Sequence, residues 1–223
     1  MFAGHIGVAL AIGRVERRVN VGVFVTAALL LDLALWSFVL LGWELVGIPG
    51  DFASTHQAQY VFPYSHGLLA AVLWSVVAAA AAYAAFASFG ATKRRVAALV
   101  LVAVLSHWFL DVLVHRPELP LTNAASYKFG LALWRNIPTA LVLEAAIVLA
   151  GLSLFVPGSR LSRVRLTALT LLSLASLALT VAGMTVAPAP PSPLAMAGSS
   201  LVVLVVVCVL AYWIGSANGQ RQA

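Results

Sequence analysis

The sequence predicts an all-α, polytopic integral membrane protein with about six transmembrane helices and a short N-terminal half-helix. Apolar residues make up 62% of the chain and charged residues 9%, a balance far from that of soluble domains. Several apolar runs are about as long as a membrane span, and a chain of 223 residues leaves only short loops between them. Residues 1–223 are therefore expected to form a single membrane domain.

Each expected span is an apolar run long enough to cross the hydrocarbon core as a helix of about 20 residues. The expected spans are 19–41, 65–89, 96–115, 136–156, 164–186 and 197–215. The apolar segment from Phe2 to Gly13 is too short to cross and is the predicted half-helix. Arg165 is the one ionisable residue in the last two spans. Residues 157–223 are therefore expected to be scaffold helices, and residues 1–156 are expected to carry any site.

The distribution of Lys and Arg predicts the orientation in the membrane. When successive connections are assigned to alternate sides, ten of the thirteen Lys and Arg fall on one side. The basic runs on that side are 14–18, 93–95 and 160–165, followed by Arg221. The positive-inside rule places this side, with both ends of the chain, in the cytoplasm. The net charge of +6 is then explained by the ends of the spans, and we expect no nucleic-acid partner.

Three ionisable side chains lie in a row on the span 96–115. His107, Asp111 and His115 are spaced four residues apart, so at about 100° per residue they share one stripe of the helix. Imidazoles and carboxylates are metal ligands, and an ionisable group inside a span indicates function by default. The alternative is that these side chains are buried polar contacts that hydrogen-bond neighbouring helices. The single cysteine, Cys208, lies in an apolar run and excludes a thiolate cluster.

Ionisable residues on other segments are expected at a similar depth. A rise of 1.5 Å per residue from the basic ends puts Asp32 at about 20 Å, Asp111 and Glu144 at about 24 Å, and His5 at about 14 Å. His66 begins the second span from the outer side. These side chains converge on the middle to outer half of the bilayer, where a cation or a water-filled cavity must neutralise them.

Three basic residues depart from the charge rule because they lie in an outer connection, 116–135. Arg116, Lys128 and Arg135 are either interfacial side chains that reach the membrane surface or a rim that binds a phosphate or carboxylate. His115 ends the preceding span, where contact with a metal ligand or with the substrate is as plausible as direct ligation.

Four motifs in residues 1–135 resemble, in the same order, those of a bacterial inner-membrane family, the membrane-bound metal-dependent hydrolases of the LexA-regulated type. The matching elements are Gly4-His5, Leu31-Asp32, Ser65-His66, and Ser106-His107 with Asp111. The resemblance covers about 60% of the chain. It implies a protein of the bacterial inner membrane that holds a divalent metal, and it implies a metal site more strongly than any particular substrate.

The chain departs from the family pattern in two places. The family's first aspartate run often reads Pro-Asp-x-Asp, whereas Leu31-Asp32-Leu33-Ala34 keeps a single carboxylate. A second histidine that often stands just upstream of the family's histidine motif is replaced by Phe62 and Pro63. A site for two metal ions would therefore need His115 or Glu144 to compensate for these missing ligands.

The expected function is a membrane-embedded hydrolase with zinc as its cofactor. The expected metal ligands are His5, Asp32, His66, His107 and Asp111. The metal would lower the pKa of a bound water, and the hydroxide would attack a phosphoester or acyl ester of a lipid-like substrate that enters from the outer leaflet. Catalysis would involve Asp32 or Glu144 as the general base, with His115, and the anionic head group would bind Arg116, Lys128 and Arg135.

The alternative function is a proton- or cation-coupled transporter. Asp32, Asp111 and Glu144 would then relay protons or bind a cation near the midplane. Against it, the two halves of the chain show no repeat. Two further polar residues of the outer loop 42–64, Glu44 and His56, are expected to be solvated. Membrane lipid is the expected surrounding partner, and the sequence leaves the oligomeric state open.

Overall fold

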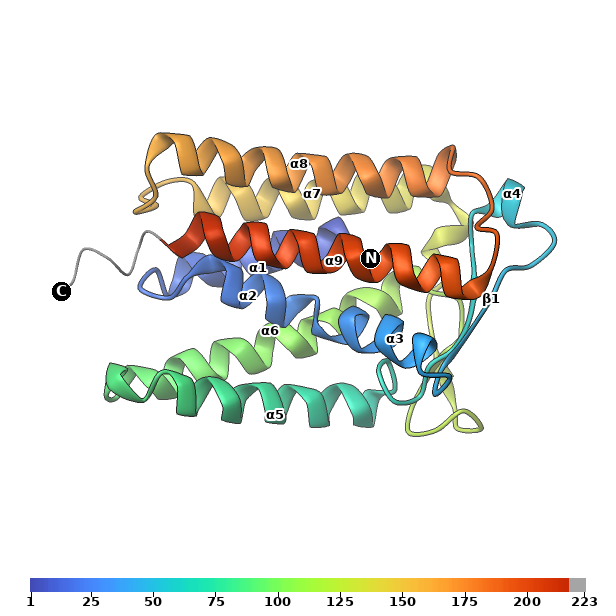
Figure 1. The fold of residues 1–223 in the computed structure, drawn as a ribbon, viewed down its shortest axis with the longest axis horizontal. Helices are drawn as coiled ribbons and strands as arrows, with labels where there is room; N and C mark the ends of the chain where they lie inside the picture. The colour runs from blue at the N-terminus through green and yellow to red at the C-terminus, as the bar shows by residue number, and fades with distance from the viewer. Residues whose placement is uncertain (217–223) are drawn as a thin grey trace.

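The computed structural model describes residues 1–216 as a bundle of helices with two small β-hairpins at one end (Figure 1). The α-helices are α1 (Ala3–Val15), α2 (Val21–Ala28), α3 (Leu30–Leu40), α4 (Phe52–Thr55), α5 (Leu68–Ala85), α6 (Thr92–Val114), α7 (Ile137–Phe155), α8 (Arg163–Thr185) and α9 (Pro193–Gly215). The 3-10 helices are η1 (Ala87–Phe89) and η2 (Leu133–Arg135). The strands are β1 (Leu45–Gly47), β2 (Gln59–Val61), β3 (Leu119–Pro120) and β4 (Lys128–Phe129).

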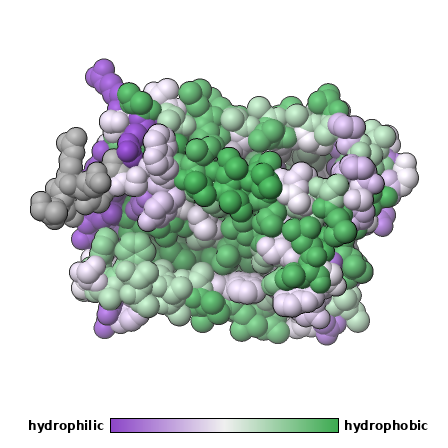
Figure 2. All heavy atoms as spheres, in the orientation of Figure 1, coloured by the Kyte–Doolittle hydropathy of each residue, from purple (hydrophilic) through white to green (hydrophobic). Residues whose placement is uncertain are grey.

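The predicted all-α, polytopic architecture is confirmed. Within residues 1–216, the five helices α5 to α9 are each long and apolar enough to cross a membrane, and α2 with α3 makes a sixth when the bent pair is counted as one span. Helix α1 is the shorter apolar helix expected at the N-terminus. In Figure 2, hydrophobic residues cover the middle of the visible face, and hydrophilic residues gather toward its two ends. Such a surface is suited to lipid, because water would solvate it poorly.

Basic residues that the charge rule assigned to one side do meet at one end of the bundle. The Arg18 side chain donates to the Glu16 carboxylate at 3.0 Å, and Arg95 donates to the carbonyl of Val15. The hydrogen bonds from Arg18 hold the pKa of Glu16 below its usual value, although burial acts in the opposite direction. Arg17 donates to Pro157, which ties the end of α1 to the α7–α8 connection. Arg221 lies outside the described residues.

Helix α1 lies at the centre of the bundle and packs closely against α7. Gly7 and Gly151 face each other at this crossing, because a Cβ on either glycine would overlap backbone atoms of the other helix. Small residues that let two backbones approach are typical of helix packing in membranes. The contact fixes the position of His5, which lies half a turn from Gly7 on α1 and is fully buried.

The predicted span 19–41 corresponds to α2 and α3, which are bent by 51° relative to each other at a short break. The bend falls at Leu29, which ends one helix and precedes the next. It places Asp32 in the first turn of α3, where the positive end of the helix dipole favours a carboxylate. It also leaves the carbonyl of Ala28 in the last turn of α2, where a carbonyl has no hydrogen-bond donor within its own helix. Broken spans of this kind surround binding sites in other membrane proteins.

The hairpins cover the end of the bundle opposite Arg17, Arg18 and Arg95 (Figure 1). Strand β1 pairs with β2, and β3 pairs with β4, both antiparallel. Just after β4, the amides of Leu131 and Ala132 donate to the carbonyls of Val112 and His115 at 2.7 Å. The last turn of α6 is thereby closed by backbone hydrogen bonds, which fixes the position of His115.

Candidate metal centre

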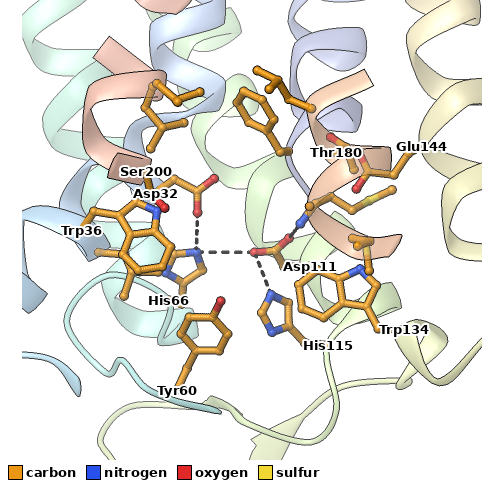
Figure 3. A pocket seen from close by; sticks show the side chains of 18 of the residues that line it. Asp32, Trp36, Tyr60, His66, Asp111, His115, Trp134, Glu144, Thr180 and Ser200 are labelled. Carbon is orange, nitrogen blue, oxygen red and sulfur yellow. Dashed lines mark hydrogen bonds and ion pairs between the residues drawn. The ribbon is translucent and has the colours of Figure 1, made fainter. Parts of the chain in front are cut away.

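The structure brings the five expected metal ligands together in one cluster. His5 comes from α1, Asp32 from α3, His66 from the residues before α5, and His107 and Asp111 from α6. The side chain of Asp32 is 19% exposed, and the other four are buried. Figure 3 shows Asp32, His66, Asp111 and His115 pointing toward one another across a cavity.

Three ligand atoms of this cluster form a nearly equilateral triangle. The Nε2 atoms of His66 and His107 are 3.2 Å apart. The Asp111 Oδ2 atom lies 3.4 Å from the first and 3.3 Å from the second. Ligand atoms placed about 2.0–2.1 Å from a tetrahedral zinc ion are about 3.3–3.4 Å from one another. The triangle therefore has the size of one face of a zinc coordination tetrahedron, and Asp32 Oδ1 lies 3.6 Å from both Nε2 atoms.

His107 is held in one tautomer by the broken span. Its Nδ1 atom donates to the carbonyl of Ala28 at 2.7 Å, at the end of α2. The proton of the neutral ring is therefore on Nδ1, and the lone pair of Nε2 points into the cluster. Metal-bound histidines are commonly oriented by a bond of this kind from the other ring nitrogen.

His66 is held in the same tautomer by a chain of two hydrogen bonds. Ser65 Oγ donates to Glu44 Oε2 at 2.6 Å, so it accepts from His66 Nδ1 at 2.8 Å. The other oxygen of Glu44 accepts from the amides of Tyr64 and Ser65. The expectation that Glu44 is solvated is wrong: it is 1% exposed, because the β1–β2 hairpin folds it under the start of α5. Burial raises the pKa of the Glu44 carboxyl, and the bonds from Ser65 oppose that rise.

The two anchored histidines bring several acceptor atoms close together, and the Met1 ammonium pairs with one of them, Asp111 Oδ1. With both Nδ1 atoms committed as donors, the two facing Nε2 atoms are acceptors, and Asp32 and Asp111 add further acceptor oxygens. Four acceptor atoms in a buried cluster repel one another unless a cation or added protons lie between them. His5 stacks on His107 with ring centroids 3.6 Å apart, and neither of its buried ring nitrogens has a hydrogen-bond partner among the described residues. The chemistry of this donor set fits a divalent metal ion.

His115 lies at the edge of the cluster and is anchored by a residue that sequence reasoning missed. Its Nδ1 atom is 2.8 Å from Glu118 Oε1, and its Nε2 atom is 3.7 Å from Asp111 Oδ2. Glu118 is buried, and nothing in the spacing of the sequence marked it, because it follows the end of α6. His115 is therefore placed to contact a ligand or a substrate, as expected, beside the main triangle.

Glu144 reaches the cluster from α7. Its Oε2 atom accepts from the amide of Gly4 at 2.8 Å, while the buried Oε1 atom has no hydrogen-bond partner among the described residues. The amino group of Met1 lies 2.6 Å from Asp111 Oδ1. The depth count, which placed Glu144 level with Asp111, agrees with this arrangement.

A cavity of about 370 Å³ adjoins the cluster. Asp32, His66, Asp111, His115 and Glu144 line it. Helices α8 and α9, which were expected to be scaffold, also form part of its wall. The cavity gives a ligand access to the cluster.

The outer basic residues lie away from the cavity wall. Arg116 donates to the carbonyl of Ala58 at 3.1 Å and lies 3.8 Å from the Glu118 carboxylate. Lys128 is half-buried in β4, and Arg135 is exposed at the end of η2. The anion-binding rim therefore stays a prediction. His56, expected to be solvated, is half-buried at the end of α4.

Comparison of the chain with protein-family models, curated proteins and solved structures finds no match. The resemblance seen in the motifs therefore stays a hypothesis, and the functional argument depends on the geometry of the cluster.

Replacing Ser65 by alanine is expected to lower the affinity for zinc by about 10–100-fold, the usual cost of losing an outer-shell partner of a metal ligand. The substitution breaks the link between Glu44 and His66 and frees the imidazole to change its tautomer. Titration of the metal-free protein with zinc would measure the effect. Ser75→Ala is the matched control, because Ser75 is also buried but bonds only the carbonyl of Ala71 in its own helix. Equal affinities in the two variants would contradict the anchoring role.

Proposed function

We propose that the protein is a membrane-embedded metal-dependent hydrolase that cleaves a phosphoester or ester of a lipid-like substrate. The observation that carries the proposal is the triangle of His66, His107 and Asp111, with both imidazoles anchored through Nδ1. Three protein ligands with a fourth position left for water or substrate are typical of catalytic zinc sites. The resemblance of the motifs to the inner-membrane hydrolases supports the same conclusion.

One ion, and not two, is the number that this arrangement favours. Two groups of side chains could hold a metal, His5 with Asp32 and His107, and His66 with His107 and Asp111. His107 belongs to both, and its Nδ1 atom is committed to Ala28. A neutral imidazole offers one lone pair, so the two groups compete for the same Nε2 atom. A single ion is therefore expected in place of the two-metal pattern of the family that the motifs resemble.

The remaining polar groups of the cavity are suited to proton transfer. A bound divalent ion would supply Lewis acidity toward water and toward a carbonyl or phosphoryl oxygen. Glu144, whose Oε2 atom is held by Gly4, keeps Oε1 free to take up a proton as the general base. His115, oriented by Glu118, is placed to give a proton to the leaving oxygen. Asp32, more exposed than the ligands of the triangle, completes the ligand set or shares the role of base.

The orientation follows from the basic end of the bundle. The positive-inside rule places that end in the cytoplasm of a bacterial cell, and the cluster then lies toward the outer leaflet of the inner membrane, near the hairpins. A substrate with an apolar body would reach it from the lipid. Arg116, Lys128 and Arg135 are the candidates for binding an anionic head group near the outer surface.

Replacing Glu144 by glutamine is expected to lower kcat by about 10²–10⁴-fold, the usual contribution of a general base, while the zinc content stays unchanged. The amide keeps the size of the side chain and an oxygen for the Gly4 amide, but it cannot take up the proton. Zinc would be measured by elemental analysis of the purified full chain, and turnover would be measured with bis-p-nitrophenyl phosphate and with p-nitrophenyl esters.

Two outcomes would reject parts of the proposal. If Glu144→Gln hydrolyses these substrates as fast as the parent protein, Glu144 is not the base. If the washed parent protein contains no stoichiometric metal and takes up a solute in proteoliposomes when a pH gradient is applied, without cleaving it, a coupled transporter replaces the hydrolase.

A further inference from the structure

We propose that the cavity beside the candidate metal centre binds a single acyl chain of an amphiphilic substrate, and that the chain enters between α8 and α9. The inference rests on the proposed hydrolase function, because it assigns the substrate class of that same site. It adds a binding role for two helices that the sequence marked only as scaffold.

The wall of the cavity combines charged and apolar side chains. One side carries the carboxylates and imidazoles of the cluster, and the side formed by α8 and α9 has no ionisable residue and includes Leu179, Met184, Val203 and Leu204 beside the hydroxyls of Thr180, Ser199 and Ser200. A ligand that fills the cavity must therefore combine a polar group with an apolar body. The volume of about 370 Å³ is near the lower end of the range for ligand pockets, about 300–1,000 Å³. This size favours one chain over two.

Small residues leave the wall open between α8 and α9. Gly183 on α8 and Ser199 on α9 line the cavity and are also exposed on the surface of the bundle. A Cβ placed on Gly183 would meet no atom within 4 Å. The two helices contact each other and run side by side in Figure 1, and both are apolar enough to lie in hydrocarbon. A chain from the surrounding lipid could reach the cavity here without crossing water.

Two buried polar atoms on the cavity wall are free to form a hydrogen bond with a ligand. Glu144 Oε1 and Trp134 Nε1 have no hydrogen-bond partner among the described residues, and both residues line the cavity. Buried polar groups are normally paired, so unpaired ones next to a cavity point to a ligand or to water. An ester or phosphoester oxygen can accept from Trp134 Nε1, while a hydroxyl or water can donate to Glu144. The polar end of an amphiphile satisfies both groups, and its chain extends toward α8 and α9.

Photolabelling with a diazirine analogue of palmitic acid tests the inference. The full chain would be placed in phosphatidylcholine nanodiscs and treated with a chelator, so that labelling needs neither metal nor turnover. Labelled residues would be identified by mass spectrometry. We expect adducts on Met184, Val203 or Leu204, and we expect Gly183→Trp to reduce them by about tenfold, because an indole between α8 and α9 excludes the chain from the apolar side chains of the cavity.

Gly198→Trp is the matched control, because Gly198, on α9, likewise has open space around it but does not line the cavity. It should leave the adducts unchanged. The inference is overturned if Gly183→Trp and Gly198→Trp label alike, or if the outward-facing Val202, which is 62% exposed, is labelled as strongly as its neighbour Val203. Loss of the metal site in the preceding experiments would not alter the labelling pattern, so the failures of the two proposals are distinguishable.

Discussion

Replacing His107 by alanine is expected to lower zinc affinity by more than the roughly 100-fold that loss of an outer-shell partner can cost, and to abolish hydrolysis. The reason is that His107 belongs to both groups that could hold a metal, so no alternative set of three donors is left among them. The ring also stacks on His5 and bonds to Ala28. Elemental analysis of washed protein and a zinc titration would measure the effect.

His56→Asn is the control for this experiment. It removes an imidazole from the loop 42–64, and asparagine tolerates the left-handed backbone of that residue, where φ is 52°. It should bind zinc like the parent protein. Comparing His5→Ala with His66→Ala then shows which group is used, because the larger loss of affinity identifies the set that includes that histidine. Stoichiometric zinc in His107→Ala would reject both groups.

The sequence predicted the spans and most of the cluster because two simple physical constraints apply inside a membrane. Spans must be long apolar helices, so their number follows from hydropathy. Ionisable residues inside spans need polar surroundings, so Asp32, Asp111 and Glu144 had to face the interior. A constant rise per residue then placed them at a similar depth, and the structure shows these side chains lining one cavity.

What the sequence could not predict depends on the path of the chain outside regular helices. Glu44 and Glu118 lie in connections whose conformation follows from hairpin pairing and not from a helical period, so their approach to His66 and His115 left no pattern. The bend at Leu29 was also hidden, because neither proline nor glycine marks it and residues 27–31 around it are all apolar. Both features concern the atoms that orient the ligands, which is information that hydropathy does not carry.

Replacing Gly151 by valine is expected to destabilise the bundle by about 1–3 kcal/mol, as overpacking of a close contact usually does. A side chain at Gly151 would fall on the backbone of Gly7, so α1 and α7 must separate. Thermal unfolding in detergent would measure the loss. Gly198→Val is the control, because a Cβ there meets open space, and it should unfold at the temperature of the parent protein or above it.

The same substitution tests whether α1 is part of the site or only part of the bundle. His5 and the Gly4 amide that holds Glu144 are both on α1, so displacing the helix should lower zinc affinity and hydrolysis together with stability. His5→Ala leaves the two helices packed, so the zinc affinity of that variant measures what the imidazole that stacks on His107 contributes by itself. If Gly151→Val loses stability but keeps the parent zinc affinity, α1 supplies packing alone, and the ligand set reduces to His66, His107 and the two aspartates.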